Sequence, residues 1–347
     1  MTPPATPRRG WLPVRKPLSS RRETTLAVAS FALPLVLWAA VSYVPFLWHP
    51  FVRIIDAGDG EYTAGTLVER AAFAEYERGL IEQGGRPPQG VRANPVYLPA
   101  PHEVALAFYT AFRTPPRLPS EPWLHQSLGR SLRVILYGFL ISSAIGIPLG
   151  LLCGTFTFFS KLSEPFVEFF RYLPAPAFGA LCVAVMGIYD APKIAIIVIG
   201  TLFQQVLIVA NTTRRLDLGL IEAAQTLGAS RKQLLTKVVV PGVIVDLYTD
   251  TRILLGWAWT YLMVAELVGT TTGITYLINQ QARYRNYANV YAGIMLIGLI
   301  GLGSDMLLAW LGRRLFPWQP RAGKRSMGEM VRAVLPGSEA TAPASAA

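Results

Sequence analysis

The sequence predicts an all-α membrane protein of about six transmembrane helices, with a long extracytoplasmic segment after the first of them. Composition, apolar runs and basic clusters predict this fold. Apolar residues make up 52% of the 347-residue chain and charged residues 15%, against roughly 25% charged in a soluble domain. The formal net charge is nevertheless +11. This combination argues against a soluble protein and is typical of a membrane protein with basic loops.

The apolar runs place the spans, because a helix needs about 20 mostly apolar residues to cross the hydrocarbon core. Residues 26–48 form the first predicted span. The third span is short, since Pro174 and Pro176 interrupt its start. A membrane core of residues 131–315 holds the other five spans, expected at residues 134–156, 174–188, 194–210, 253–268 and 290–311. Of these, the span at residues 253–268 is extended backward toward Pro241.

Basic residues set the orientation of the chain in the membrane. They gather in residues 1–25, in the loop between the fourth and fifth spans, and after the sixth span. An even number of spans with both termini in the cytoplasm puts all three clusters on one side. Residues 316–347 end in Ala, Ser and Pro and are predicted to form a disordered cytoplasmic tail. Ser20-Arg21-Arg22 also resembles a twin-arginine export signal, but the apolar run after it is too long, which favours a membrane anchor.

Residues 49–130, between the first two spans, are predicted to lie outside the cytoplasm. Apolar residues at helical spacing predict an amphipathic helix over residues 63–83. A second short helix is predicted over residues 102–112, with Pro101 in its first turn. All three histidines of the chain occur in this segment without the spacing of a metal motif, so no metal site is expected.

The cytoplasmic loop between the fourth and fifth spans carries strong local signals for two short helices. Asp217 is a good N-cap for the first helix, and Gly228 suits the left-handed position that ends it. Ser230 and Gln233 form a capping box for the second helix, and Pro241 is placed to open the following span. By this pattern alone, a docking helix and a merely well-capped loop are equally good interpretations.

This loop resembles the EAA loop of the permeases of binding-protein-dependent ABC importers. Residues 217–241 meet every spacing of that motif, with Glu222, Ala223, Ala224, Gly228, Val238, Val240 and Pro241 at the matching positions. Other stretches are similar to the nitrate, sulfonate and taurine branch, namely residues 98–101, 103–104 and 146–150 together with Arg252, Trp259 and Glu266. The chain departs from that branch at Asp250, where glycine is usual, and in its longer insert after the first span.

The resemblance implies a permease subunit of an ATP-driven importer, in the inner (cytoplasmic) membrane of a bacterial cell, for a small anion of the nitrate, sulfonate or taurine type. It implies docking on the ATPase through Glu222, Ala223, Ala224, Leu227, Gly228, Ala229 and Pro241. The expected partners are an ATPase dimer, a second permease copy in a homodimer, a solute-binding protein and the lipid bilayer, with no nucleic acid. ATP and Mg²⁺ are expected on the ATPase, and no cofactor on the permease. Gly323-Lys324 is the nearest match to a phosphate loop, but Trp318 stands where that motif needs glycine.

Polar residues within the spans are candidates for the translocation pathway, because ionisable groups in membranes face protein or water. These candidates are Gln204, Gln205, Asp250, Arg252, Trp259 and Glu266. Contacts within the helix bundle explain most of them equally well or better, and for Asp250, near the cytoplasmic start of the fifth span, simple solvation is the alternative. A second hypothesis is an ion-coupled secondary transporter, in which Glu266 and Asp305 would form the coupling path. It leaves the cytoplasmic loop without a function, and no inverted repeat is evident. A membrane-embedded enzyme ranks third, since neither a metal ligand set nor a nucleophile constellation is evident, and no catalytic residue is named.

Overall fold

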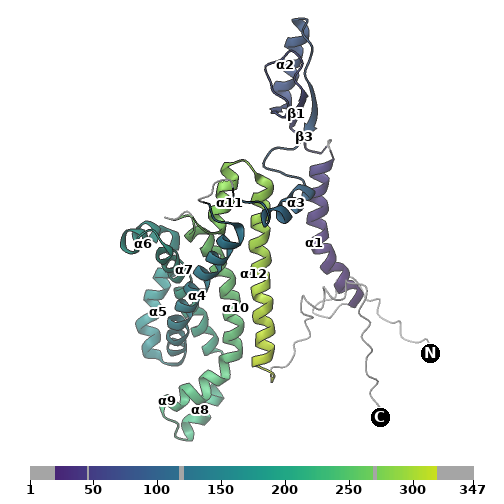
Figure 1. The fold of residues 1–347 in the computed structure, drawn as a ribbon. Coiled ribbons are helices and arrows are strands. Elements are labelled where there is room, and N and C mark those ends of the chain that lie inside the picture. The colour runs from purple at the N-terminus through teal and green to yellow at the C-terminus, as the bar shows by residue number, and fades with distance from the viewer. Residues whose placement is uncertain (1–19, 45–46, 117–120, 269–271, 319–347) are drawn as a thin grey trace, which may run out of the picture. The chain divides into compact units, whose positions relative to one another are not determined.

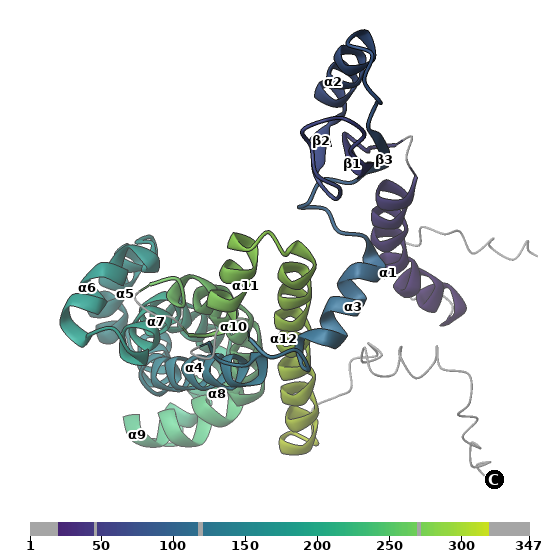
Figure 2. The same cartoon turned by 45° about the horizontal axis from the view of Figure 1, so that its top comes forward.

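The computed structural model describes residues 20–44, 47–116, 121–268 and 272–318 of the chain. These residues are mostly helical, as predicted (Figures 1 and 2). Residues up to Pro101 belong to one compact unit, and His102–Gln319 form another. Each unit has hydrophobic clusters of its own.

The first unit contains the first predicted span and a small α/β module. Helix α1, Ser20–Tyr43, is long and apolar enough to cross a membrane. Strands β1 (Phe51–Asp56), β2 (Leu67–Glu69) and β3 (Gln89–Ala93) form an antiparallel sheet in the order β2-β1-β3. Helix α2, Arg70–Glu82, follows β2 directly.

This α/β module was not predicted. The amphipathic helix expected over residues 63–83 begins only at α2, because the residues before it pair with β1 as strand β2. In β1, successive side chains point to opposite faces, so that Val52 and Ile54 face the same way. Both are buried with Val68 of β2 and Phe73 of α2, and these four residues form the core of the module.

The second unit is a bundle of helices that begins with α3. Pro101 opens α3, as predicted. The elements are α3 (Pro101–Ala111), α4 (Leu124–Thr155), α5 (Thr157–Arg171), the 3-10 helix η1 (Ala175–Phe178), α6 (Gly179–Met186), α7 (Asp190–Arg214), α8 (Leu218–Thr226), α9 (Arg231–Gln233), the π-helix η2 (Leu234–Val239), α10 (Val240–Ala265), α11 (Ile274–Arg283) and α12 (Tyr287–Leu315).

Four helices among the described residues are long and apolar enough to cross a membrane, namely α1, α4, α7 and α12. Helix α5 and the η1–α6 segment would together make a fifth span, bent by 87°. The predicted third span, residues 174–188, is therefore not a straight helix, because Pro174 precedes a 3-10 turn there. Helix α10 has 26 residues, about 39 Å, and the charges in its first half lower its hydropathy. A total of six spans stays a prediction.

Helices α4 and α7 pack in the same direction with their backbones close together. A Cβ atom on Gly150 would lie 2.7 Å from the carbonyl oxygen of Val206, and one on Gly154 would lie 2.7 Å from that of Ala210. No side chain fits at such distances, so these two positions require glycine. Small residues repeated every four positions are a common means of helix association in membranes. The motif at residues 146–150 therefore has a packing role.

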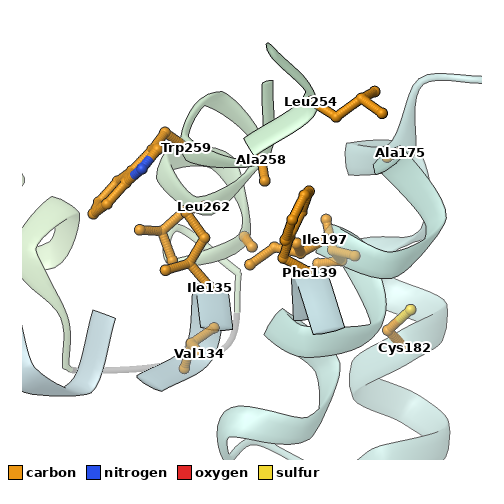
Figure 3. Packing of buried hydrophobic residues seen from close by; sticks show 12 residues of the cluster. Val134, Ile135, Phe139, Ala175, Cys182, Ile197, Leu254, Ala258, Trp259 and Leu262 are labelled. Atoms are coloured by element: carbon orange, nitrogen blue, oxygen red, sulfur yellow. The ribbon is translucent and has the colours of Figure 1, made fainter. Parts of the chain in front are cut away.

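The core of the bundle lies between α4, α7 and α10 (Figure 3). Its buried residues are Val134, Ile135, Phe139, Ala175, Cys182, Ile196, Ile197, Leu254, Ala258, Trp259, Leu262 and Ala265. The loop with α8 lies at one end of this bundle and α11 at the other, and we name these the loop end and the α11 end (Figure 1). The core therefore joins the two ends through three packed helices.

Candidate functional site

The loop at the loop end begins with α8, which has the predicted N-cap. The Asp217 side chain accepts a hydrogen bond from the Gly219 N–H at 2.9 Å. No residue of α8 is buried. Leu218 is exposed, and Leu227, directly after the helix, is 88% exposed. A helix that leaves such apolar side chains in the open is suited to contact another surface.

Gly228 ends α8 in the predicted left-handed conformation, with φ of +78°. Its N–H donates to the carbonyl of Gln225 at 2.9 Å, and the Ala229 N–H donates to that of Ala224 at 3.0 Å. This pairing satisfies the last carbonyls of the helix and fixes the angle at which the chain leaves it. The turn is therefore a defined structure, and its geometry depends on glycine.

The second helix of the loop starts as predicted and then changes type. The Ser230 N–H donates to Gln233 Oε1 at 2.8 Å, and the Gln233 N–H donates to Ser230 Oγ at 3.4 Å, which completes the capping box. After the three residues of α9, the chain forms the π-helix η2. Pro241 has no N–H to donate to the carbonyl of Lys237, so the regular helical ladder cannot pass through it. The π-turn, which the sequence analysis missed, runs directly into α10.

The base of the loop is anchored in the bundle. Leu216, just before α8, packs against a buried cluster of Val209, Val243 and Leu247 from α7 and α10. A Cβ atom on Gly242 would lie 2.7 Å from the Leu216 side chain, so the contact is close. All seven predicted coupling residues lie on this anchored loop or at its junction with α10. A force applied to α8 would therefore reach α7 and α10.

Glu266, at the α11 end, is the centre of a buried polar network. It is 1% exposed and accepts hydrogen bonds from Ser131 Oγ and from the Thr275 N–H, the latter at 2.8 Å. Ser131 Oγ in turn accepts from the Ile274 N–H at 2.9 Å. Lys193, also buried, donates to the Thr272 carbonyl at 3.0 Å. The network ties α4, α7 and α10 to the start of α11, and only Glu266 was singled out from the sequence.

Gln205 is also enclosed by the chain's own helices. Its Oε1 accepts from Ser142 Oγ at 2.9 Å, and its Nε2 donates to Ser143 Oγ at 3.0 Å, so it joins α7 to α4. Gln204 beside it is only half-buried. The contacts of Gln205 and Glu266 fit a structural role within the helix bundle, one of the two roles expected for them. Their place in the pathway stays a prediction.

The remaining pathway candidates lie on α10. Asp250 accepts a hydrogen bond from Thr212 Oγ1 of α7. Arg252 forms a bidentate pair with Asp305 of α12, in which Nε lies 3.0 Å from Oδ1 and Nη2 lies 2.9 Å from Oδ2. Trp259 is buried, and its indole N–H has no hydrogen-bond partner among the described residues. No group of three or more His, Cys, Asp or Glu that could hold a metal occurs in the described part of the chain.

Comparison with known proteins identifies the family. The family model described as the inner membrane component of binding-protein-dependent transport systems matches residues 146–317. A protein of Brucella abortus named as a probable ABC transporter permease is 35% identical over 192 residues, which cover 55% of this chain and 77% of the relative. The chain belongs to this family. The family predicted from the sequence of this permease is therefore confirmed, and the hypothesis of a secondary transporter is not favoured.

Two further relatives place the permease in the branch suggested by its sequence. The taurine transport system permease protein TauC of Escherichia coli is 30% identical over 225 residues, covering 65% of this permease and 81% of the relative. A Bacillus subtilis protein, provisionally named the aliphatic sulfonates transport permease protein SsuC, is 29% identical over 230 residues, covering 64% and 78%. Both alignments are longer than the stretch that the family model matches.

Proposed function

We propose that this permease imports a small anion, most closely a sulfonate such as taurine, with energy from ATP hydrolysed on a separate ATPase subunit. The observation that carries the proposal is α8, an exposed and doubly capped helix with Glu222-Ala223-Ala224 on it, anchored between α7 and α10. A secondary transporter has no use for such a helix. The relatives named for taurine and aliphatic sulfonates support the substrate class.

In this mechanism α8 docks in a groove of the ATPase and transmits its movement. Closure of two ATPases around ATP and Mg²⁺ would draw two docked helices together, so two permease copies are needed, and a symmetric homodimer is the simplest arrangement. Leu216 and its cluster would pass the movement to α7 and α10. Because α7 packs closely on α4 and Gly200 of α7 lies close to Tyr261 of α10, the bundle would move largely as one body.

The orientation follows from the same proposal. The loop end faces the cytoplasm, where the ATPase is, and both termini lie there too. The α11 end then faces outward, toward a solute-binding protein that delivers the substrate. The basic residues near α8, such as Arg215, Arg231 and Lys232, are exposed at the loop end, in agreement with the positive-inside rule.

The proposal is tested by uptake into proteoliposomes that contain the permease, its ATPase and its solute-binding protein. We expect uptake of radiolabelled taurine or ethanesulfonate that requires ATP on the cytoplasmic side and survives an ionophore. Uptake driven by an ion gradient in the absence of ATP would instead establish a secondary transporter. Uptake that depends on ATP but excludes every anion offered would retain the importer and overturn the substrate class.

A further inference from the structure

We propose that Arg252, Trp259 and Asp305 form an anion-binding site in the middle of the membrane, along the seam between α10 and α12. In this mid-membrane anion site, Asp305 is a built-in counter-ion that holds Arg252 while the site is empty, and the transported anion displaces it. The inference rests on the proposed function, since it names the residues that would handle the anionic substrate.

The depth of Asp305 in the membrane is the first argument. It lies 18 residues after Tyr287 and 10 residues before Leu315, about 27 Å and 15 Å from the two ends of α12. The hydrocarbon core is about 30 Å thick, so the carboxylate lies well inside it. Its side chain is nevertheless 48% exposed in the isolated chain. Charged groups at this depth avoid lipid. The seam therefore faces water or protein, as the wall of a translocation pathway does.

The shape of the ion pair is the second argument. The Arg252 guanidinium presents two parallel N–H groups, through Nε and Nη2, to the two carboxylate oxygens of Asp305. A sulfonate, a nitrate or a carboxylate offers oxygens at a similar spacing and matches the same fork. Substrate and Asp305 would therefore compete for one donor set. While the site is empty, Asp305 neutralises the charge of Arg252. When an anion enters, it takes the place of Asp305.

An unused donor on the same seam is the third argument. Trp259 lies seven residues after Arg252, two turns further along the same face of α10. Figure 3 shows its side chain turned away from Leu254. The Nε1 atom is buried without a hydrogen-bond partner among the described residues, and the residue as a whole is only 8% exposed. Buried donors are nearly always paired, so an unpaired donor two helical turns from a cation on the same face suggests that an anion completes it.

Glycines leave room for a ligand along the seam. A Cβ atom on Gly301, one turn of α12 from Asp305, would lie 4.0 Å from Trp259 Nε1, so the indole N–H and the carboxylate border the same stretch of α12. A Cβ atom on Gly256 or Gly298 would meet nothing within 4 Å. The seam is thus lined by donors from α10 and is not filled by side chains at these positions.

A purely structural role for the ion pair makes the opposite prediction. If the pair only fastens α10 to α12, its loss should weaken the protein and leave anion binding unchanged. Tyr248 offers a matched control, because its hydroxyl group donates to the Leu308 carbonyl at 2.7 Å and also fastens these two helices. Tyr248→Phe removes that contact without touching the three residues of the mid-membrane anion site.

The test measures binding of ethanesulfonate to the purified permease–ATPase complex in lipid nanodiscs, as a concentration-dependent rise in melting temperature. Ethanesulfonamide, of similar shape and without charge, is the ligand control. We expect Asp305→Asn to lower the half-saturating concentration of ethanesulfonate about tenfold, because Arg252 is released. Arg252→Gln should abolish saturable binding, and Trp259→Phe should raise the half-saturating concentration about fivefold. Tyr248→Phe should lower the melting temperature alone.

Unchanged or weaker ethanesulfonate binding by Asp305→Asn would overturn the site. Equal responses to ethanesulfonamide would do so as well. If Asp305→Asn does not fold, Trp259→Phe decides, because it removes the unpaired donor and keeps an aromatic ring at that position. Failure of the wild type to import any anion, combined with tighter binding by Asp305→Asn, would refute the proposed substrate and leave the site standing. Normal uptake by Asp305→Asn, Arg252→Gln and Trp259→Phe would refute the site and leave the importer.

Discussion

Removal of the Glu266 carboxylate tests the polar network at the α11 end. In Glu266→Ala, the Thr275 N–H loses its acceptor inside the protein, where Thr275 is 4% exposed. An unpaired buried donor costs about 1–3 kcal/mol. The Ser131 hydroxyl loses the same acceptor, whereas buried Lys193 keeps its pairing with Asp190 at 3.6 Å. We take about 3 kcal/mol, the upper end of this range, as the loss of free energy of unfolding.

This loss is measured by thermal unfolding of the purified permease. For a chain of 347 residues it corresponds to a fall in melting temperature of roughly 4 °C. Glu266→Gln keeps one carbonyl acceptor in the same place and should lose about half as much. Two results would show that the hydrogen bonds accepted by Glu266 do not stabilise the α11 end. One is an alanine variant with the melting temperature of the wild type, and the other is a glutamine variant with a lower melting temperature than the alanine variant.

Three further predictions concern packing, the turn after α8 and the module of the first unit. Gly150→Leu should separate α4 from α7, since even a Cβ atom there would lie 2.7 Å from a backbone oxygen. The yield of folded permease, measured by size-exclusion chromatography, should fall severalfold. A normal yield would refute the close contact. Gly228→Val should transport less than Gly228→Ala, because a β-branched residue resists a φ of +78°; equal uptake would mean that the turn relaxes without cost. Residues 53–94 can be replaced by a short linker, because Phe51 and Ala93 are paired neighbours in the sheet. This replacement should weaken binding of the solute-binding protein at least tenfold. Unchanged binding would show that the module does not contact that partner.

The coupling loop could be predicted closely because its signals are local. Asp217, Gly228, Ser230 and Gln233 act on backbone groups within three residues of themselves, so their chemistry can be read from the sequence. The long spans were found for the same reason, since hydrophobicity over 20 residues needs no tertiary information. Pro241 lies in the first turn of α10, as predicted, but the π-turn that runs into it was missed, because the sequence gives no local signal for it.

Features that depend on distant residues could not be read from the sequence. The three-residue strand β2 exists only because it pairs with β1, and by itself its sequence continues the helical pattern of α2. Ser131 and Glu266 are 135 positions apart, and nothing near either residue indicates the other. Likewise Arg252 was singled out as an intramembrane charge, whereas its pairing with Asp305 required the packing of α12 on α10.

The central claim is that α8 couples the permease to a separate ATPase, and co-purification measures this most directly. Ala224→Arg places a long charged side chain on α8, and Ala224→Ser is the matched variant that keeps a small one. We predict that affinity-tagged wild type and Ala224→Ser retain the ATPase subunit in equal amounts. Ala224→Arg should insert in the membrane normally and lose at least nine-tenths of the ATPase, about tenfold in affinity. Full recovery of the ATPase by Ala224→Arg would contradict the account.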